Sequence, residues 1–148
     1  MIQSLASKDQ HGFDWVDLSD PGNGEIKQIA AQYQLHEASI KDCMQPDHLP
    51  KYEILDNYSF VIFRVLDTQP VHEADTIQEL TNKIAIFFTE TYLITVHKKE
   101  NTLIELVKTK RIDSGKCEGT LHLLNALIRE SILTFDQPGM KLSETLDY

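Results

Sequence analysis

This chain of 148 residues is short of cysteine and of long apolar stretches, and each shortage excludes a class of protein. Its two cysteines, Cys43 and Cys117, lack the spacing of a zinc or redox motif, which favours a reducing compartment. The longest apolar run, residues 84–88, is far shorter than the roughly 20 apolar residues that span a bilayer. The first residues also lack an apolar core of signal-peptide length, so we expect no secretion.

Basic residues are scarce as well. There are 14 Lys and Arg against 23 Asp and Glu, which gives a formal net charge of −9. Nucleic acids require a basic binding face, so we expect no nucleic-acid partner. An acidic surface attracts cations, although most acidic domains are simply soluble. The length fits one domain, residues 1–148, which can bury about 70% of its unfolded-chain surface without disulfides or bound metals.

Residues 1–50 predict a strand and two helices. An edge strand over residues 14–18 places Trp15 among apolar neighbours, where we expect its side chain to be buried. Ser19 or Asp20 can cap a helix that begins at Pro21. The apolar stripe of this helix consists of Ile26, Ile29, Ala30 and Tyr33. A second helix over residues 37–44 is expected to bury Ala38, Ile40 and Cys43, and Pro46 and Pro50 stop it.

Residues 51–97 predict a sheet of two hairpins. Strands over 51–55 and 58–66 meet at Asp56-Asn57, and strands over 77–88 and 92–97 follow a polar loop at 68–75. Apolar residues occur on both alternating faces of 58–66, so we predict a central strand that is covered on both sides.

Residues 98–148 predict helices. Asn101 caps one with Leu103, Ile104 and Val107 on a stripe, and a polar break follows at 113–116. Residues 120–135 form the next helix, and its predicted buried stripe is Leu123, Leu124, Leu127, Ile128 and Leu133. A further helix begins at Met140. The order of elements predicts an α+β (mixed α/β) fold with a central mixed sheet sandwiched by helices.

Two patterns for an enzyme can be tested on the sequence. Gly22-x-Gly24 opens a helix about 20 residues before Asp42, as a dinucleotide fingerprint does, but Lys27 replaces the third glycine. Cys43 with His36 or His48 could supply a thiol nucleophile, but Cys43 lies near a helix end, where no dipole lowers a thiol pKa. A surface helix and a buried core thiol are the simpler interpretations, and we expect no catalytic residues.

Histidines give no zinc motif. His36-Glu37 and His72-Glu73 each begin a metalloprotease-like pair, but Ile40 and Thr76 stand where the second histidine is needed. His97 reads as a strand-end residue. Asp17 and Asp20 read as a cap and solvated surface.

Several short motifs together carry a resemblance over most of the chain. They are Trp15-Val16-Asp17-Leu18 before a Pro-led helix, Gln34-Leu35-His36, Lys41-Asp42, Leu49-Pro50-Lys51-Tyr52-Glu53, Asn57-Tyr58-Ser59-Phe60, and Tyr92-Leu93-Ile94-Thr95-Val96-His97. This series resembles the cytoplasmic amino-terminal domain of the CorA-like divalent-cation (magnesium and cobalt) transporters. The Gly-Met-Asn pore motif and the membrane helices of that family are absent from this sequence.

The resemblance implies a regulatory and structural domain on the cytoplasmic side of the cell membrane. It implies a homo-oligomer, a pentamer in the family, with Mg²⁺ as both the transported and the regulatory ion of the full-length protein. The fragment itself would require no cofactor, and residues 98–148 would lead to stalk and membrane helices beyond Tyr148.

The resemblance also implies a metal ligand. Asp42 matches the second acid of a pair that helps bind a regulatory ion between subunits, whereas Lys41 replaces the first acid. Arg129 stands at the position of a further acidic contributor, and Glu130 follows it. Two alternatives stay open: a zinc-transporting member of the same superfamily, and a stand-alone cytoplasmic enzyme.

Overall fold

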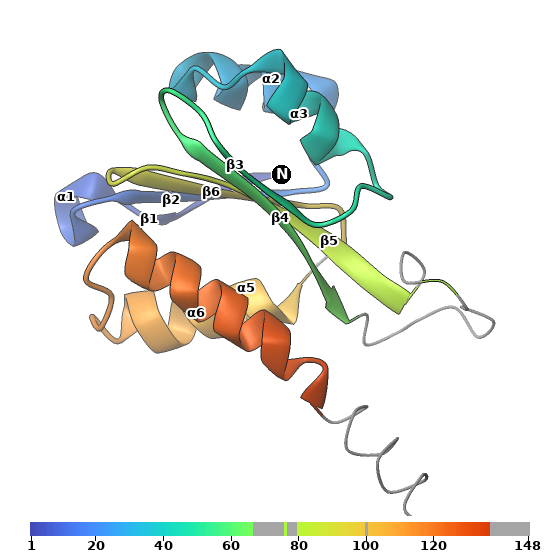
Figure 1. Cartoon of the computed structure of the whole chain (residues 1–148). Helices are drawn as coiled ribbons and strands as arrows, with labels where there is room; N and C mark the ends of the chain where they lie inside the picture. The colour runs from blue at the N-terminus through green and yellow to red at the C-terminus, as the bar shows by residue number, and fades with distance from the viewer. Residues whose placement is uncertain (67–75, 77–79, 100, 137–148) are drawn as a thin grey trace, which may run out of the picture.

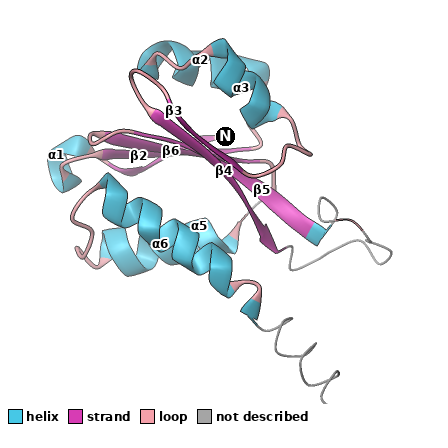
Figure 2. Cartoon of the chain, viewed as in Figure 1, coloured by secondary structure: helices cyan, strands magenta, loops and turns pink. Residues whose placement is uncertain are grey.

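A computed structural model describes residues 1–66, 76, 80–99 and 101–136. In these residues, six strands form one sheet in the order β1-β2-β6-β5-β4-β3 (Figures 1 and 2). The strands are β1 (Ile2–Ala6), β2 (Asp14–Ser19), β3 (Lys51–Ile54), β4 (Ser59–Leu66), β5 (Thr81–Phe88) and β6 (Tyr92–His97). The helices are α1 (Lys8–His11), α2 (Asn23–Tyr33), α3 (Glu37–Met44), α5 (Thr102–Val107), the π-helix η1 (Lys108–Asp113) and α6 (Thr120–Leu133).

The sheet is mixed, as predicted. β2 and β6 run parallel, with Trp15 opposite Leu93, and the other neighbouring strands run antiparallel. The prediction of β2 as an edge strand is wrong, because β1 pairs with its outer side. The sequence analysis assigned no strand to residues 2–6.

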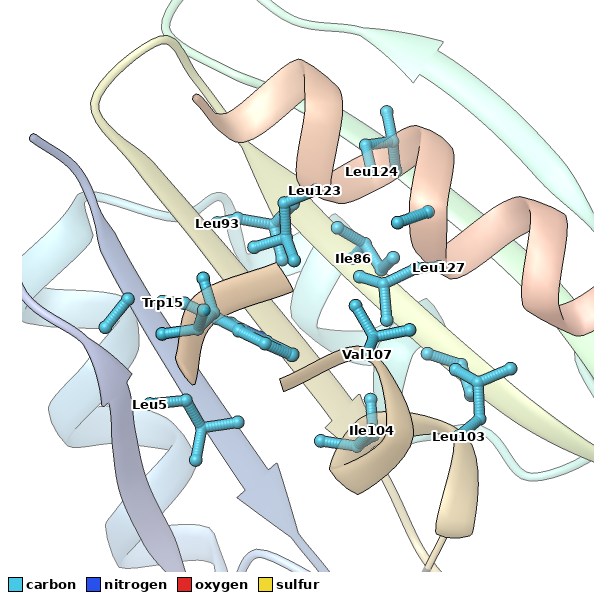
Figure 3. Close-up of a cluster of buried hydrophobic side chains, with 14 of the residues drawn as sticks. Leu5, Trp15, Ile86, Leu93, Leu103, Ile104, Val107, Leu123, Leu124 and Leu127 are labelled. Atoms are coloured by element: carbon cyan, nitrogen blue, oxygen red, sulfur yellow. The ribbon is translucent and has the colours of Figure 1, made fainter. Parts of the chain in front are cut away.

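Helices cover both faces of the sheet. α2 and α3 lie on one face, and α5 and α6 lie on the other (Figure 1). On the second face, Trp15, Ile86 and Leu93 of the sheet pack with residues of these two helices (Figure 3). The helix residues labelled there are Leu103, Ile104, Val107, Leu123, Leu124 and Leu127. The predicted sandwich and the burial of Trp15, which is 0% exposed, are confirmed.

β4 is covered on both faces, as predicted, but it lies second from an edge and is not central. Phe60 and Ile62 belong to the core under α2 and α3, whereas Val61 and Phe63 pack against the core under α5 and α6. β5 is described from Thr81 and not from residue 77. The predicted loop at 68–75 lies outside the described residues.

The predicted start of α2 and the predicted buried stripe of α3 need correction. α2 begins at Asn23, with Gly22 as its N-cap in place of Ser19 or Asp20, because the Gly22 N–H donates to Glu25 Oε1 at 3.2 Å. In α3, Ala38 is exposed, and Ser39 is buried instead, where its hydroxyl accepts from Tyr58 Oη at 2.8 Å.

In the third part of the chain, Asn101 caps α5 as predicted, since its side chain accepts from the Leu103 N–H at 3.0 Å. In the predicted buried stripe of α6, Leu123, Leu124 and Leu127 are buried as predicted, but Leu133 is 47% exposed. The helix predicted from Met140 lies outside the described residues.

Candidate cation-binding site

Asp42 lies in the last turn of α3 and already has a cationic partner. Its carboxylate accepts a hydrogen bond from Lys51 Nζ of β3, and the same ammonium donates to Glu53. His48 Nε2 lies 3.6 Å from the other Asp42 oxygen. The hydrogen bond from Lys51 is the main reason why the pKa of Asp42 is lowered, and the charge of Lys41 contributes least. The local cation at Asp42 is therefore Lys51, not the neighbouring Lys41.

Lys51 is held between two acids. Partial burial by itself would lower the pKa of Lys51, but its hydrogen bonds to Asp42 and Glu53 outweigh burial and raise it. The two carboxylates thus share one ammonium at the entry to β3.

Two further cationic side chains, Lys83 and Arg64, donate hydrogen bonds to backbone carbonyls at and just after the end of α3. Lys83 of β5 donates to the backbone carbonyls of Asp42, Cys43 and Gln45, the last at 2.5 Å. A cation at this position also complements the negative end of the helix dipole. Burial lowers the pKa of Lys83.

Arg64 of β4 is the cross-strand partner of Lys83. Its Nη1 donates to the carbonyls of Pro46 and His48 at 3.3 and 3.2 Å, and its Nε donates to Thr81 Oγ1 at 2.7 Å. Arg64 lies in the predicted strand over residues 58–66, but its sequence context predicts no role for it. A basic residue on the same face as buried Phe60 and Ile62 is the signal that could have revealed it.

The α6 residues at and after the position of the expected acidic contributor, Arg129 and Glu130, do not reach Asp42 within one chain. Arg129 is exposed, and Glu130 pairs with Lys110 Nζ at 3.3 Å. α6 and α3 cover opposite faces of the sheet (Figure 1). Any site that combines the ends of these two helices therefore requires a second subunit.

The donor set among the described residues of one chain does not fit a resident magnesium ion. Among the described residues, no group of three or more His, Cys, Asp and Glu side chains could hold a metal. Asp42 offers one carboxylate, and an ammonium occupies it. Magnesium needs near-octahedral oxygen ligands and keeps several waters, so Asp42 could contribute only one ligand of a shared site.

The geometry does not support either enzyme pattern. Cys43 is 3% exposed, and burial raises the pKa of its thiol to about 12, so the thiol stays protonated and inert at neutral pH. A Cβ added at Gly22 or Gly24 would meet nothing within 4 Å, so no close packing demands a glycine there. Cys43 is the buried core thiol that we predicted.

The interpretation of Asp17 as a cap or solvated surface is wrong. Asp17 and His97 are each 5% exposed, and His97 Nε2 lies 2.9 Å from Asp17 Oδ2. His97 does end β6, as predicted, but it also forms part of a buried polar network that the sequence did not reveal.

The fold is a mixed sheet with two helical layers, and none of its described helices is long and apolar enough to cross a membrane. The soluble domain of CorA from Methanocaldococcus jannaschii has the same fold, with a TM-score of 0.60 and 17% identity over 97% of this chain and 56% of that one. The family described as CorA-like Mg²⁺ transporter protein matches residues 10–148, and the chain belongs to this family.

Solved structures show the same fold. The cytoplasmic domain of ZntB from Vibrio parahaemolyticus RIMD 2210633 is similar with a TM-score of 0.74 and 17% identity, over 91% of this chain and 54% of that one. The complete CorA magnesium transporter from Methanocaldococcus jannaschii gives a TM-score of 0.67 and 18% identity, over 91% and 42%. The full-length CmaX protein gives 0.75 and 12%, over 91% and 40%.

The chain thus spans about half the length of these proteins or less. No curated protein sequence matches it.

Proposed function

We propose that this chain is the cytoplasmic regulatory and structural domain of a homo-oligomeric magnesium channel of the CorA-like family. The observation that carries the proposal is the family match over residues 10–148, together with the fold shared with a CorA soluble domain. In this role the domain transports nothing by itself. It surrounds the cytoplasmic side of the pore, and its helical layer formed by α5 and α6 leads toward the membrane part.

A net charge of −9 suits such a regulatory role. Acidic subunits that assemble side by side repel one another, and a divalent cation between them offsets the repulsion. When the cation concentration falls, the balance shifts toward separated subunits. The ion is then both the cargo of the pore and the signal that limits its passage.

Within this proposal, Asp42 contributes one carboxylate to a regulatory site shared between subunits. The divalent ion has to compete with Lys51 for this carboxylate, so we expect weak binding. Millimolar Mg²⁺ is the relevant range, since the chain by itself supplies one carboxylate and Mg²⁺ is commonly bound through waters.

The test is ion flux through the full-length protein in liposomes, measured against Mg²⁺ on the cytoplasmic side. Asp42→Asn should shift the inhibition curve to higher Mg²⁺, and Lys51→Met should shift it to lower Mg²⁺, because the competing ammonium is removed. Glu37→Gln is the matched control, because Glu37 is an exposed acid in the first turn of α3, whereas Asp42 lies in its last turn. Superimposable curves for all three variants and the wild type would show that Asp42 is ordinary surface.

Zinc transport is the second candidate. The TM-score of 0.74 to the ZntB cytoplasmic domain exceeds the 0.67 and 0.60 to the two CorA structures. The same liposomes separate the two candidates, since Zn²⁺ flux in the presence of excess Mg²⁺ would favour zinc as the cargo. We propose no catalytic activity, which agrees with the buried, protonated thiol of Cys43.

A further inference from the structure

A chain of hydrogen bonds runs through the buried junction of β2 and β6. Trp15 Nε1 donates to Thr95 Oγ1 at 3.2 Å, and Thr95 Oγ1 donates to Asp17 Oδ1 at 2.5 Å. His97 Nε2 lies 3.0 and 2.9 Å from the two Asp17 oxygens, and His97 Nδ1 lies 2.6 Å from the Lys99 carbonyl oxygen. This series of hydrogen bonds therefore joins β2 and β6 to the connection between β6 and α5.

The direction of each hydrogen bond follows from the chemistry of the groups. The indole N–H of Trp15 can only donate, so the hydroxyl hydrogen of Thr95 is left for Asp17. The Lys99 carbonyl can only accept, so Nδ1 of His97 has to carry a hydrogen. Nε2 also needs a hydrogen to bond the carboxylate of Asp17. Both ring nitrogens thus face acceptors, which is the arrangement that an imidazolium satisfies and a neutral imidazole does not.

We propose that His97 is a proton sensor. While the ring is protonated, its hydrogen bonds hold the connection between β6 and α5 against β2. Loss of the proton breaks these hydrogen bonds and frees that connection. A cavity of about 870 Å³ between the sheet and the helices α5 and α6 is lined by Asp17, His97 and Lys99. This cavity gives the buried ring a route for proton exchange with solvent. The sensor does not depend on the transport proposal, because the bonds lie within one chain.

Other charged groups surround His97 on both faces of the sheet. Those that line the two adjoining cavities are the Met1 amino group, Asp20, Arg64, Lys83, Lys98, Lys99, Glu105 and Glu130. Carboxylates, lysines and arginines ordinarily titrate well away from neutral pH, but an α-amino group does not. A form acetylated at Met1 therefore serves as a control.

The sign of the pH effect follows from the bound proton. Burial alone would lower the pKa of His97, but the hydrogen bond and the negative charge of Asp17 outweigh burial and raise it above its ordinary value of 6.5. The stabilisation of the connection between β6 and α5 by the protonated ring is fully present below pH 6.5, and it is lost as the pH rises through the raised pKa of His97. Between pH 6.5 and the raised pKa of His97, the equilibrium constant for opening of this connection grows by up to about tenfold per pH unit.

The experiment combines NMR titration of the His97 ring with amide hydrogen exchange at a series of pH values. Protection factors, which remove the intrinsic pH dependence of exchange, should fall with rising pH at Lys98, Lys99 and α5. Those in α3 should stay constant. In Asp17→Asn the ring should titrate at lower pH, and the loss of protection should move with it.

His36→Gln is the matched control, because His36 is an exposed histidine in front of α3. It should leave the pH profile of α5 unchanged, whereas acetylation of Met1 should move that profile only to higher pH, because the positive amino terminus lowers the pKa of His97. Thr95→Val keeps the charge pair and tests the network if Asp17→Asn fails to fold. A His97 ring in the wild type that titrates at or below pH 6.5, or equal pH dependence of α3 and α5, would overturn the proposal.

Discussion

Replacement of Trp15 tests the architecture most directly. The side chain is 0% exposed, it packs in the core under α5 and α6, and its indole N–H donates to Thr95 (Figure 3). Truncation of a buried Trp to Ala costs about 3–5 kcal/mol, and the lost hydrogen bond accounts for about 1 kcal/mol of this. Since domains are stable by about 5–15 kcal/mol, Trp15→Ala should remove a large share of the total.

Trp15→Phe divides this cost into two parts. It keeps an aromatic ring in the core but removes the N–H donor, so we expect a loss of about 1–2 kcal/mol. Thr95→Val, alone and combined with Trp15→Phe, completes a double-mutant cycle that isolates the bond between the two side chains.

Urea unfolding followed by far-UV circular dichroism is the assay, because the variants with Trp15 replaced lack the single Trp of the chain. The thermal midpoint of Trp15→Ala should fall by about 6–20 °C, since 1 kcal/mol corresponds to about 2–4 °C in a domain of this size. A loss below about 1 kcal/mol would refute the placement of Trp15. So would wild-type emission typical of indole in water.

Three further predictions concern reactivity, the end of α3, and assembly. A thiol reagent at pH 8 should modify half-buried Cys117 well before buried Cys43; equal rates by mass spectrometry would contradict the burial. Lys83→Met should destabilise the domain to urea by about 1–2 kcal/mol, because three carbonyls at the end of α3 lose their donor, whereas exposed Lys98→Met should not. The isolated chain should sediment as a monomer or weak dimer in about 0.1 M salt, and a stable ring would show that assembly needs no further segment.

Local signals in the sequence predicted the bounds of an element correctly where those signals were strong. The bounds predicted for α3 and β6 match the structure, since Pro46 stops the helix and a continuous β-branched and apolar run forms the strand. β1 could not be predicted in this way. Its residues include Gln3 and Ser4, and what makes it a strand is its pairing with β2, which is a tertiary contact.

The polar networks escaped the sequence analysis for a related reason. An aspartate is almost never buried unless it is paired, so Asp17 was assigned to the surface. Its partner, His97, lies 80 residues away in the chain, and only the parallel pairing of β2 and β6 brings the two together. The family resemblance correctly indicated the fold, and it drew attention to Asp42 without revealing Lys51 as its partner.

The two ends of the sheet have different physical characters, and the connections explain why. β2 continues into α2 on one face, whereas its parallel neighbour β6 continues into α5 on the other face (Figure 1). A crevice opens at the carboxyl ends of strands where connections diverge in this way. His97 lies there and lines both cavities, and its carbonyl accepts from the Asp20 N–H at 2.8 Å.

Polar groups fill that end because diverging backbones leave carbonyls and amides that apolar side chains cannot satisfy. The opposite end is closed by the tight turn between β5 and β6, where the Thr89 N–H donates to the Tyr92 carbonyl at 2.9 Å. The network of Asp17 and His97 and the proposed cation site above Lys83 both lie toward the diverging end, which joins the two helical layers. In the proton-sensor proposal, loss of the His97 proton loosens α5 against the sheet, whereas the apolar contacts around Trp15 and Leu93 keep the layers together.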